Sequence, residues 1–287
     1  MTSYLVRSVM PATLALLAAT IVDAGETRLQ AQGRLDAAYN VTLGGLPFGT
    51  GNWRVEVAQD HYTATASGRT GGLLKLFTSG RGTTASQGKV AGGQPIPASF
   101  ASSIATDKKY DEVRMLFAGS NVKEYVAEPP NLPNPERVPI TEAHRRNVVD
   151  PMTASMMKVP GSGSTFVPEA CPRSVPIFDG RMRYDLQMQF KRLERVHSEK
   201  GYQGNVVVCA VHFTPIAGHV PSRPAIKYLF ELRDTELWLG PIAGTRLMVP
   251  YRASLPTPFG MAVLQATEFT STVASSAPPA AANARAQ

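Results

Sequence analysis

Two cysteines are the residues whose chemistry the sequence predicts most directly. Cys171 and Cys209 are the only cysteines of the chain, and they do not form a CxxC pair of the kind used in thiol exchange. The N-terminal residues predict export, and an exported chain with an even number of cysteines usually pairs them, so we expect a disulfide, with two buried thiols as the alternative. A bridge between them would close the loop of residues 172–208, and closing a loop of that length stabilises a fold by roughly 4 kcal/mol. Two cysteines without nearby paired histidines do not complete a tetrahedral zinc site, so we expect no metal.

The remaining catalytic candidates form no complete motif. Gly161-Ser162-Gly163-Ser164 lacks the GxSxG spacing of a nucleophilic serine, and HExxH, P-loop and GxGxxG patterns are absent. His212 lies in an otherwise apolar stretch, which is typical of a hydrogen-bonded core residue. We therefore expect neither an enzyme nor a cofactor. A hydrolase of an envelope polymer, with Asp179, Asp185 or a histidine of shifted pKa in a cleft, is the least favoured alternative.

Arginines beside a turn offer a second kind of chemistry. Asp179-Gly180 is first of all a hairpin turn signal, and it is followed by Arg181 and Arg183, whose guanidinium groups could bind phosphate in a bidentate manner. Asp179, Arg181 and Arg183 are thus candidates for a turn or an anion contact, with a solvated strand face as the simpler explanation. Nucleic acid is a poor candidate partner for an exported protein, so the expected anion is a lipid or a cell-wall polymer.

The N-terminal residues predict export. Arg7 gives a short positive flank, residues 9–22 are almost wholly apolar, and small residues precede a cleavage site before Gly25. The apolar run is short for a membrane-spanning helix, and no later stretch approaches spanning length. We therefore expect a signal peptide over residues 1–24 and a periplasmic mature chain without a transmembrane segment.

Apolar residues at every second position dominate the rest of the chain. This alternation predicts strands with one face in a core, and its clearest instance is Tyr184, Leu186, Met188 and Phe190, with polar residues between them. Other strands are predicted at residues 39–43, 53–57, 62–67, 73–78, 89–90, 112–117, 122–127, 206–213, 226–232, 236–239, 246–253 and 261–270. With 287 residues, of which 43% are hydrophobic, the chain can bury a sizeable core.

The domain organisation follows from composition. We expect a single antiparallel β domain over residues 25–270, with a proline-rich linker near residues 128–139 that could divide the sheet into halves. Residues 271–287 are rich in Ala, Ser and Pro and nearly uncharged, which predicts a disordered tail.

One short helix is expected among the strands. Asp150 can accept hydrogen bonds from first-turn amides, and Pro151 suits the first helical position. If the sheet curls into a wide or open barrel, the strand from Tyr184 to Phe190 lines an apolar groove, over which Met152 and Met156 form an adaptable flap. If the barrel is narrow, the same side chains fill it and the helix plugs one end.

Three segments resemble an exported bacterial family, the domain of unknown function numbered 3108. They are Tyr39-x-Val41-x-Leu43-x-Gly45-Leu46, the stretch from Val148 to Ala154, and the stretch from Val175 to Tyr184. The resemblance covers about residues 35–270. The chain is also similar to periplasmic envelope-integrity proteins with a disulfide-bonded β-spiral, and more remotely to the lipoprotein carriers of the Lol pathway. These resemblances imply a mainly β fold: a many-stranded antiparallel sheet curled into an open or spiral barrel, with one short helix.

The leading functional hypothesis is a non-enzymatic periplasmic protein that supports cell-envelope integrity by binding. Its partner would be a lipid, a lipoprotein or another envelope protein, held on the curled sheet. The main alternative is a structural or protein-interaction scaffold without a small ligand, which would have a filled barrel and exposed edge strands free to pair with another chain.

Overall fold

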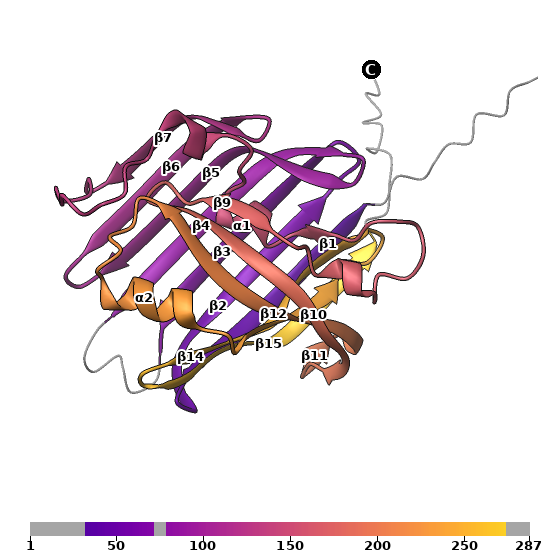
Figure 1. Ribbon diagram of the computed structural model, residues 1–287. Helices are drawn as coiled ribbons and strands as arrows, with labels where there is room; N and C mark the ends of the chain where they lie inside the picture. Colours follow the sequence, from indigo (N-terminus) through magenta and orange to yellow (C-terminus); the bar gives the residue numbers. More distant parts are fainter. Residues whose placement is uncertain (1–31, 72–78, 274–287) are drawn as a thin grey trace, which may run out of the picture. The chain divides into compact units, whose positions relative to one another are not determined.

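Strand alternation organises almost all of the structure. The computed structural model describes residues 32–71 and 79–273, and these residues form one 15-stranded sheet (Figure 1). The strands are β1 (Gly33–Leu43), β2 (Leu46–Val57), β3 (His61–Thr70), β4 (Gly80–Ala91), β5 (Gln94–Thr106), β6 (Tyr110–Ala118), β7 (Asn121–Glu128), β8 (Met157–Lys158), β9 (Val175–Phe178), β10 (Arg183–His197), β11 (Lys200–Gly201), β12 (Gln203–Ala217), β13 (Thr235–Pro241), β14 (Leu247–Thr257) and β15 (Gly260–Val273). The α-helices of the described residues are α1 (Pro151–Ala154) and α2 (Pro224–Glu231), with short 3₁₀ turns at Glu142–Arg145 and Pro168–Ala170.

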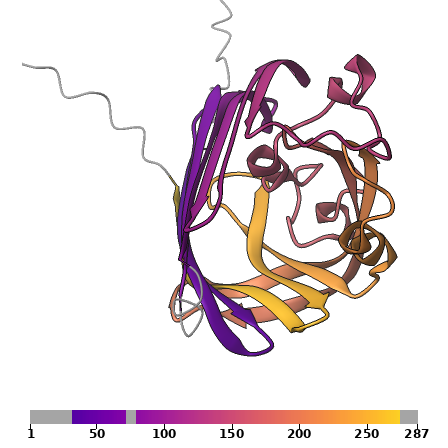
Figure 2. The same cartoon turned by 90° about the vertical axis from the view of Figure 1, so that its left-hand side faces the viewer.

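The sheet is continuous but not closed. Its strand order is β7-β6-β5-β4-β3-β2-β1-β15-β14-β13-β12-β10-β9, so β7 and β9 are its edges. Neighbours along this path are antiparallel, while β8 pairs with β14 and β11 pairs in parallel with β15. Figure 2 looks along the curled sheet, with the purple strands on one side and the orange strands opposite them. The predicted antiparallel sheet curled into an open barrel is therefore confirmed.

The main core lies on one face of β1–β6. Along β1, Leu35, Ala37 and Tyr39 are buried while the residues between them are more exposed, as the period of two requires. We call this buried face the inner face; its large side chains include Leu35, Tyr39, Trp53, Val55, Tyr62, Phe100, Val113 and Met115.

Helix α1 is fixed to the inner face by a buried polar network. Asp150 caps it as predicted, since its Oδ1 accepts hydrogen bonds from the amides of Met152 and Thr153, both at 2.9 Å. The Thr153 hydroxyl lies 2.6 Å from the Tyr62 hydroxyl of β3, and the Ser86 hydroxyl of β4 donates to Asp150 Oδ2 at 3.1 Å. Every side-chain oxygen of Asp150 is thus satisfied, and the helix is held against two strands.

A second cluster packs on the strands that follow. The predicted disulfide is confirmed: Cys171 and Cys209 are joined with an S–S distance of 2.01 Å. The buried members of this cluster are Met157, Val159, Ala170, Cys171, Met188, Val207, Cys209, Leu239 and Met248. The bridge therefore ties the segment of residues 157–175 to one face of β10, β12 and β13.

Three expectations about the elements need correction. The predicted strand at residues 226–232 is wrong, because Pro224 begins α2 and Ile226 and Leu229 point to its less exposed side at helical spacing. The structure therefore has more than the one short helix expected. The tail was expected from residue 271, but β15 continues to Val273, where it pairs with Gly33.

Other boundary expectations lie partly or wholly beyond the described residues. The predicted signal peptide over residues 1–24, the predicted strand at residues 73–78 and the rest of the predicted tail from residue 274 all lie outside them. Residues 129–139 follow β7 and carry no strand, and a single sheet contains the strands on both sides of them.

Candidate functional site

An apolar cavity of about 250 Å³ lies against the inner face. Its lining residues come from β1, β2, β3, α1 and its end, β14 and β15: Tyr39, Gly51, Asn52, Trp53, Ala66, Ser67, Met152, Ser155, Pro250 and Leu264. The Tyr39 hydroxyl donates to the Pro250 carbonyl at 2.7 Å, which fixes this ring between β1 and β14. Burial raises the pKa of Tyr39, so the hydroxyl stays protonated and remains a donor.

Trp53, one of the lining residues, carries a hydrogen-bond donor that is not used within the described structure. Its side chain lies in the main core and the residue is only 8% exposed, yet its Nε1 has no hydrogen-bond partner among the described residues. A buried indole N–H normally finds an acceptor, because leaving it unpaired costs about 1–3 kcal/mol. The cavity therefore combines an apolar lining with the ring of Trp53, whose buried N–H has no partner among the described residues.

A row of glycines leaves the inner face uncovered at one end. Gly51, Gly68 and Gly82 are paired in register across β2, β3 and β4. A Cβ added at any of them would touch only atoms of the neighbouring strands. Ile104 of β5 comes next in the row, opposite Gly82, and is 51% exposed. The inner face is thus open at this end, whereas α1 covers it around Tyr62.

The six residues predicted to form a groove are distributed over different places. Met152 lines the cavity and Met156, 1% exposed, is packed in the main core. Met188 is buried in the disulfide cluster, against which Leu186 and Phe190 pack, and Tyr184 stacks with Phe213 at 5.3 Å between ring centroids. The structure therefore does not bring Met152 and Met156 into one groove with the strand from Tyr184 to Phe190.

The predicted anion contact is a turn with paired charges. Asp179 Oδ1 accepts hydrogen bonds from the amides of Arg181 and Met182 at 2.8 and 2.7 Å. Arg181 lies 2.9 Å from Asp111 Oδ2, and Arg183 forms an ion pair with Asp185. Burial raises the pKa of Asp179. Both arginines thus have carboxylate partners, and the group stabilises the turn between β9 and β10.

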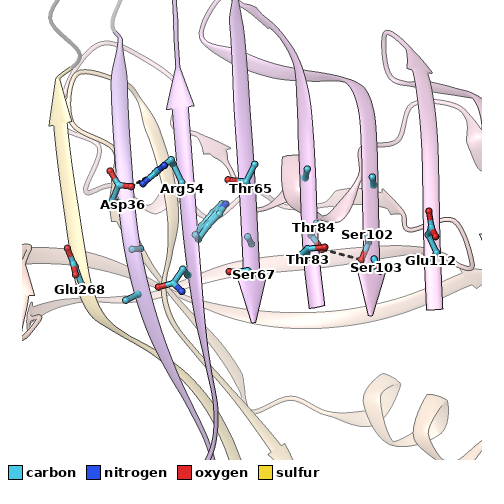
Figure 3. A pocket seen from close by; sticks show the side chains of 17 residues that line it. Asp36, Arg54, Thr65, Ser67, Thr83, Thr84, Ser102, Ser103, Glu112 and Glu268 are labelled. Carbon is cyan, nitrogen blue, oxygen red and sulfur yellow. Dashed lines mark hydrogen bonds and ion pairs between the residues drawn. The ribbon is translucent and has the colours of Figure 1, made fainter. Parts of the chain in front are cut away.

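A larger hollow, of about 600 Å³, crosses the opposite, solvent-facing side of the sheet (Figure 3). Asp36 lies there between Arg34 and Arg54, with both guanidinium Nε atoms 2.7 Å from its carboxylate oxygens. The hydrogen bond from Arg34 is the main reason why the pKa of Asp36 is lowered. The residues lining this hollow include no histidine or cysteine, and six of the seventeen are Ser or Thr. Its arrangement is that of a solvated sheet face, without a paired nucleophile and base.

The described residues offer neither a metal-binding cluster nor a membrane-spanning helix. Within residues 32–71 and 79–273, no three His, Cys, Asp or Glu side chains are grouped so that they could hold a metal ion. None of the helices in these ranges is long and apolar enough to cross a bilayer.

Sequence reasoning missed most of the cavity. Trp53, Tyr39 and Leu264 belong to strands that alternation predicted correctly, so their inward direction could be expected. Their meeting could not, because it depends on the pairing of β1 with both β2 and β15.

Comparisons with known proteins give a family and a structural neighbour. The sequence profile of the family described as protein of unknown function (DUF3108) matches residues 38–267. A crystal structure of a beta-barrel-like protein of domain of unknown function DUF1849 from Brucella abortus is similar, with 8% identity and a TM-score of 0.44. The match covers 85% of this chain and 98% of that one. A search of curated proteins finds no match.

Proposed function

The chain belongs to the DUF3108 family of proteins of unknown function, so its role must be argued from its own cavity, and we propose that it is a non-enzymatic binding protein for an acyl chain. The acyl chain would belong to a lipid or a lipoprotein of the cell envelope, and binding it would support envelope integrity. The predicted signal peptide over residues 1–24 supports a periplasmic location for this role.

The observation that carries the proposal is the apolar cavity with one unpaired donor. Tyr39, Met152 and Leu264 offer an acyl chain an apolar lining, and burial of methylene groups favours binding by about 0.8 kcal/mol each. The Trp53 N–H matches the carbonyl oxygen of an ester or amide at the head of such a chain. The glycine row from Gly51 to Gly82 supplies the uncovered inner face along which the chain would lie.

Native mass spectrometry of the mature protein purified from the periplasm, followed by solvent extraction and lipid analysis, tests the proposal. We expect a stoichiometric acyl-bearing species. A bare polypeptide mass, together with no binding of a fluorescent fatty acid in solution, would contradict the proposal.

A matched pair of variants locates the site. Gly68→Leu places a bulky side chain on the open inner face, where its Cβ comes no closer than 3.5 Å to another strand, so the fold should be kept. Thr65→Leu adds the same group to the exposed face of the same strand, away from the residues that line the cavity. We expect fatty-acid binding to fall about tenfold or more in the first variant and to stay unchanged in the second. Equal affinities in both variants would place the ligand elsewhere.

Trp53→Phe tests the donor. The substitution keeps a large aromatic side chain and removes the only polar atom, so affinity for a fatty acid should fall by about fivefold, which corresponds to one hydrogen bond of about 1 kcal/mol. The measurement is titration with the same fluorescent fatty acid. An unchanged affinity would show that the ligand makes no bond to this indole.

A specific observation also favours the second candidate, a protein-interaction scaffold. β7 is an edge of the sheet, and beside it Leu116 and Val126 are each 51% exposed in a solvent-side hollow of about 580 Å³. A free edge next to apolar side chains can accept a strand of another protein. A bare polypeptide that co-purifies with a protein partner would support this alternative.

A further inference from the structure

Two hairpin tips meet at one end of the sheet. The turn between β1 and β2 lies beside the turn between β14 and β15, where the Gly44 amide donates to the Met261 carbonyl at 3.0 Å. Gly44 and Gly45, both with positive φ, form the first turn, and Leu46, the first residue of β2, follows directly beside this tip opposite Leu43. The second turn is Pro258-Phe259, and it is closed by Gly260 with φ of 105°.

These tips carry large apolar side chains in solvent. Leu46 is 63% exposed, Phe259 81% and Met261 43%. No residue in the stretches 41–53 and 253–267 is charged. A hairpin turn does not need such side chains for its own stability, and adjacent exposed apolar residues of this size usually mark an interaction surface.

Two arginines that form no ion pair with the described residues lie close to the same end. Arg69 of β3 and Arg81 of β4 are direct partners in the antiparallel register, and both are exposed. Like charges placed opposite each other destabilise a sheet. No carboxylate of the described residues is within ion-pair distance of either, and Arg69 makes only a 3.5 Å contact to the Thr50 hydroxyl. The pair therefore forms a concentration of positive charge that is free to bind an anion.

The arginines and the tips belong to one surface. Thr50, the strand partner of Arg69, is four residues from Leu46, and the Gly71 amide at the end of β3 donates to the Phe48 carbonyl at 2.8 Å. Lys108 and Lys109 lie in the exposed turn between β5 and β6, at this same end, since Thr106 pairs with Gly80. Asp107 is the acid of that turn, and Ser79 already donates to it through its amide at 2.7 Å.

We propose that this end of the sheet docks on an anionic lipid bilayer. Leu46, Phe259 and Met261 would enter the boundary between headgroups and acyl chains, while Arg69 and Arg81 bind lipid phosphates. Apolar side chains at the tip with cations set behind them match the two layers of such a membrane surface. The glycine row of the inner face starts from these same strand ends, so a docked protein would present its cavity to the membrane. Docking rests on the exposed side chains alone and does not require the proposed acyl ligand.

Sedimentation of the full mature chain with vesicles tests the docking surface. Vesicles of phosphatidylglycerol and phosphatidylethanolamine should bind the protein, with weaker binding at high salt, and phosphatidylcholine vesicles should bind it much less. Leu46→Ser with Phe259→Ser should lower binding about tenfold or more. Arg69→Gln with Arg81→Gln should remove most of the preference for anionic vesicles and of the salt dependence.

Matched controls separate the surface from general hydrophobicity and charge. Leu132→Ser changes a side chain that is also 81% exposed but lies after β7, and Lys123→Gln with Arg195→Gln removes two exposed charges elsewhere. Both controls should bind as the natural chain does. Absence of binding to anionic vesicles would overturn the proposal. Equal losses of vesicle binding in the tip variants and the control variants would also overturn it. Gly68→Leu, which is expected to lose fatty-acid binding, should still bind anionic vesicles. The docking proposal and the acyl-binding proposal can therefore fail independently.

Discussion

At the scale of single residues, Asp150 is the group on which pH should act most clearly. It is fully buried, has no cation within ion-pair distance in the described part of the chain, and burial raises its pKa. The folded state therefore holds a proton on this carboxyl more firmly than the unfolded state does. Its contribution to the free energy of unfolding is largest at low pH and is lost as pH rises from about 4 through the raised pKa.

Asp150→Asn tests this sign. Asparagine keeps the Oδ1 acceptor for the amides of Met152 and Thr153 but cannot ionise. Urea unfolding at acid and neutral pH should show a smaller loss of stability toward neutral pH in the variant than in the natural chain. Some loss should remain, because burial also raises the pKa of Asp179. Equal pH slopes would contradict the interpretation, and Asp150→Ala should lower stability by about 1–2 kcal/mol through the lost cap.

At the scale of elements, the segment of residues 157–175 depends on its bridge. Apart from Val175, which begins β9, it carries one two-residue strand and one 3₁₀ turn, so its backbone makes few regular hydrogen bonds of its own. Cys209→Ser should lower the free energy of unfolding by about 2–4 kcal/mol, a fall of several degrees in the thermal midpoint measured by calorimetry under oxidising conditions. Cys171→Ser should give a similar fall. An unchanged midpoint in either variant would mean that the cluster holds the segment without the bridge.

At the scale of the whole molecule, the sheet joins the two ends of the described chain. β1 pairs with β15, and the Ser271 hydroxyl accepts from the Ala243 amide at 2.7 Å while donating to the Arg34 carbonyl at 3.2 Å. Deletion of residues 271–287 should therefore lower stability by about 1–3 kcal/mol, because it removes these bonds. Deletion of residues 274–287 should leave the midpoint unchanged. Thermal unfolding of the two truncations compares them directly, and equal midpoints would show that the last three residues of β15 do not contribute.

Local patterns in the sequence determined much of this protein. A period of two in apolar side chains specifies which face of a strand is buried, and an Asp-Pro pair specifies a helix start, since each effect acts over a few residues. An even pair of cysteines predicts a bridge, since it needs a single partner. The same local rules failed at α2, where Ile226, Tyr228 and Phe230 fit a period of two as well as a helix. They also missed most of β5, where Pro95 and Pro97 interrupt the pattern although a register shift at Gly88 accommodates them.

Only the tertiary structure decided which faces meet. Alternation places the apolar side chains of the strand from Tyr184 to Phe190 on one face, and it places Met152 among apolar residues. In the structure, β10 pairs with β12, and the disulfide holds residues 157–175 over that face. Helix α1 packs instead on β3 and β4. The glycine row is likewise visible as separate glycines in the sequence, and register alone aligns Gly51, Gly68 and Gly82 into an open stretch of the inner face. Contacts between residues far apart in the chain depend on register and curl, which a local pattern does not contain.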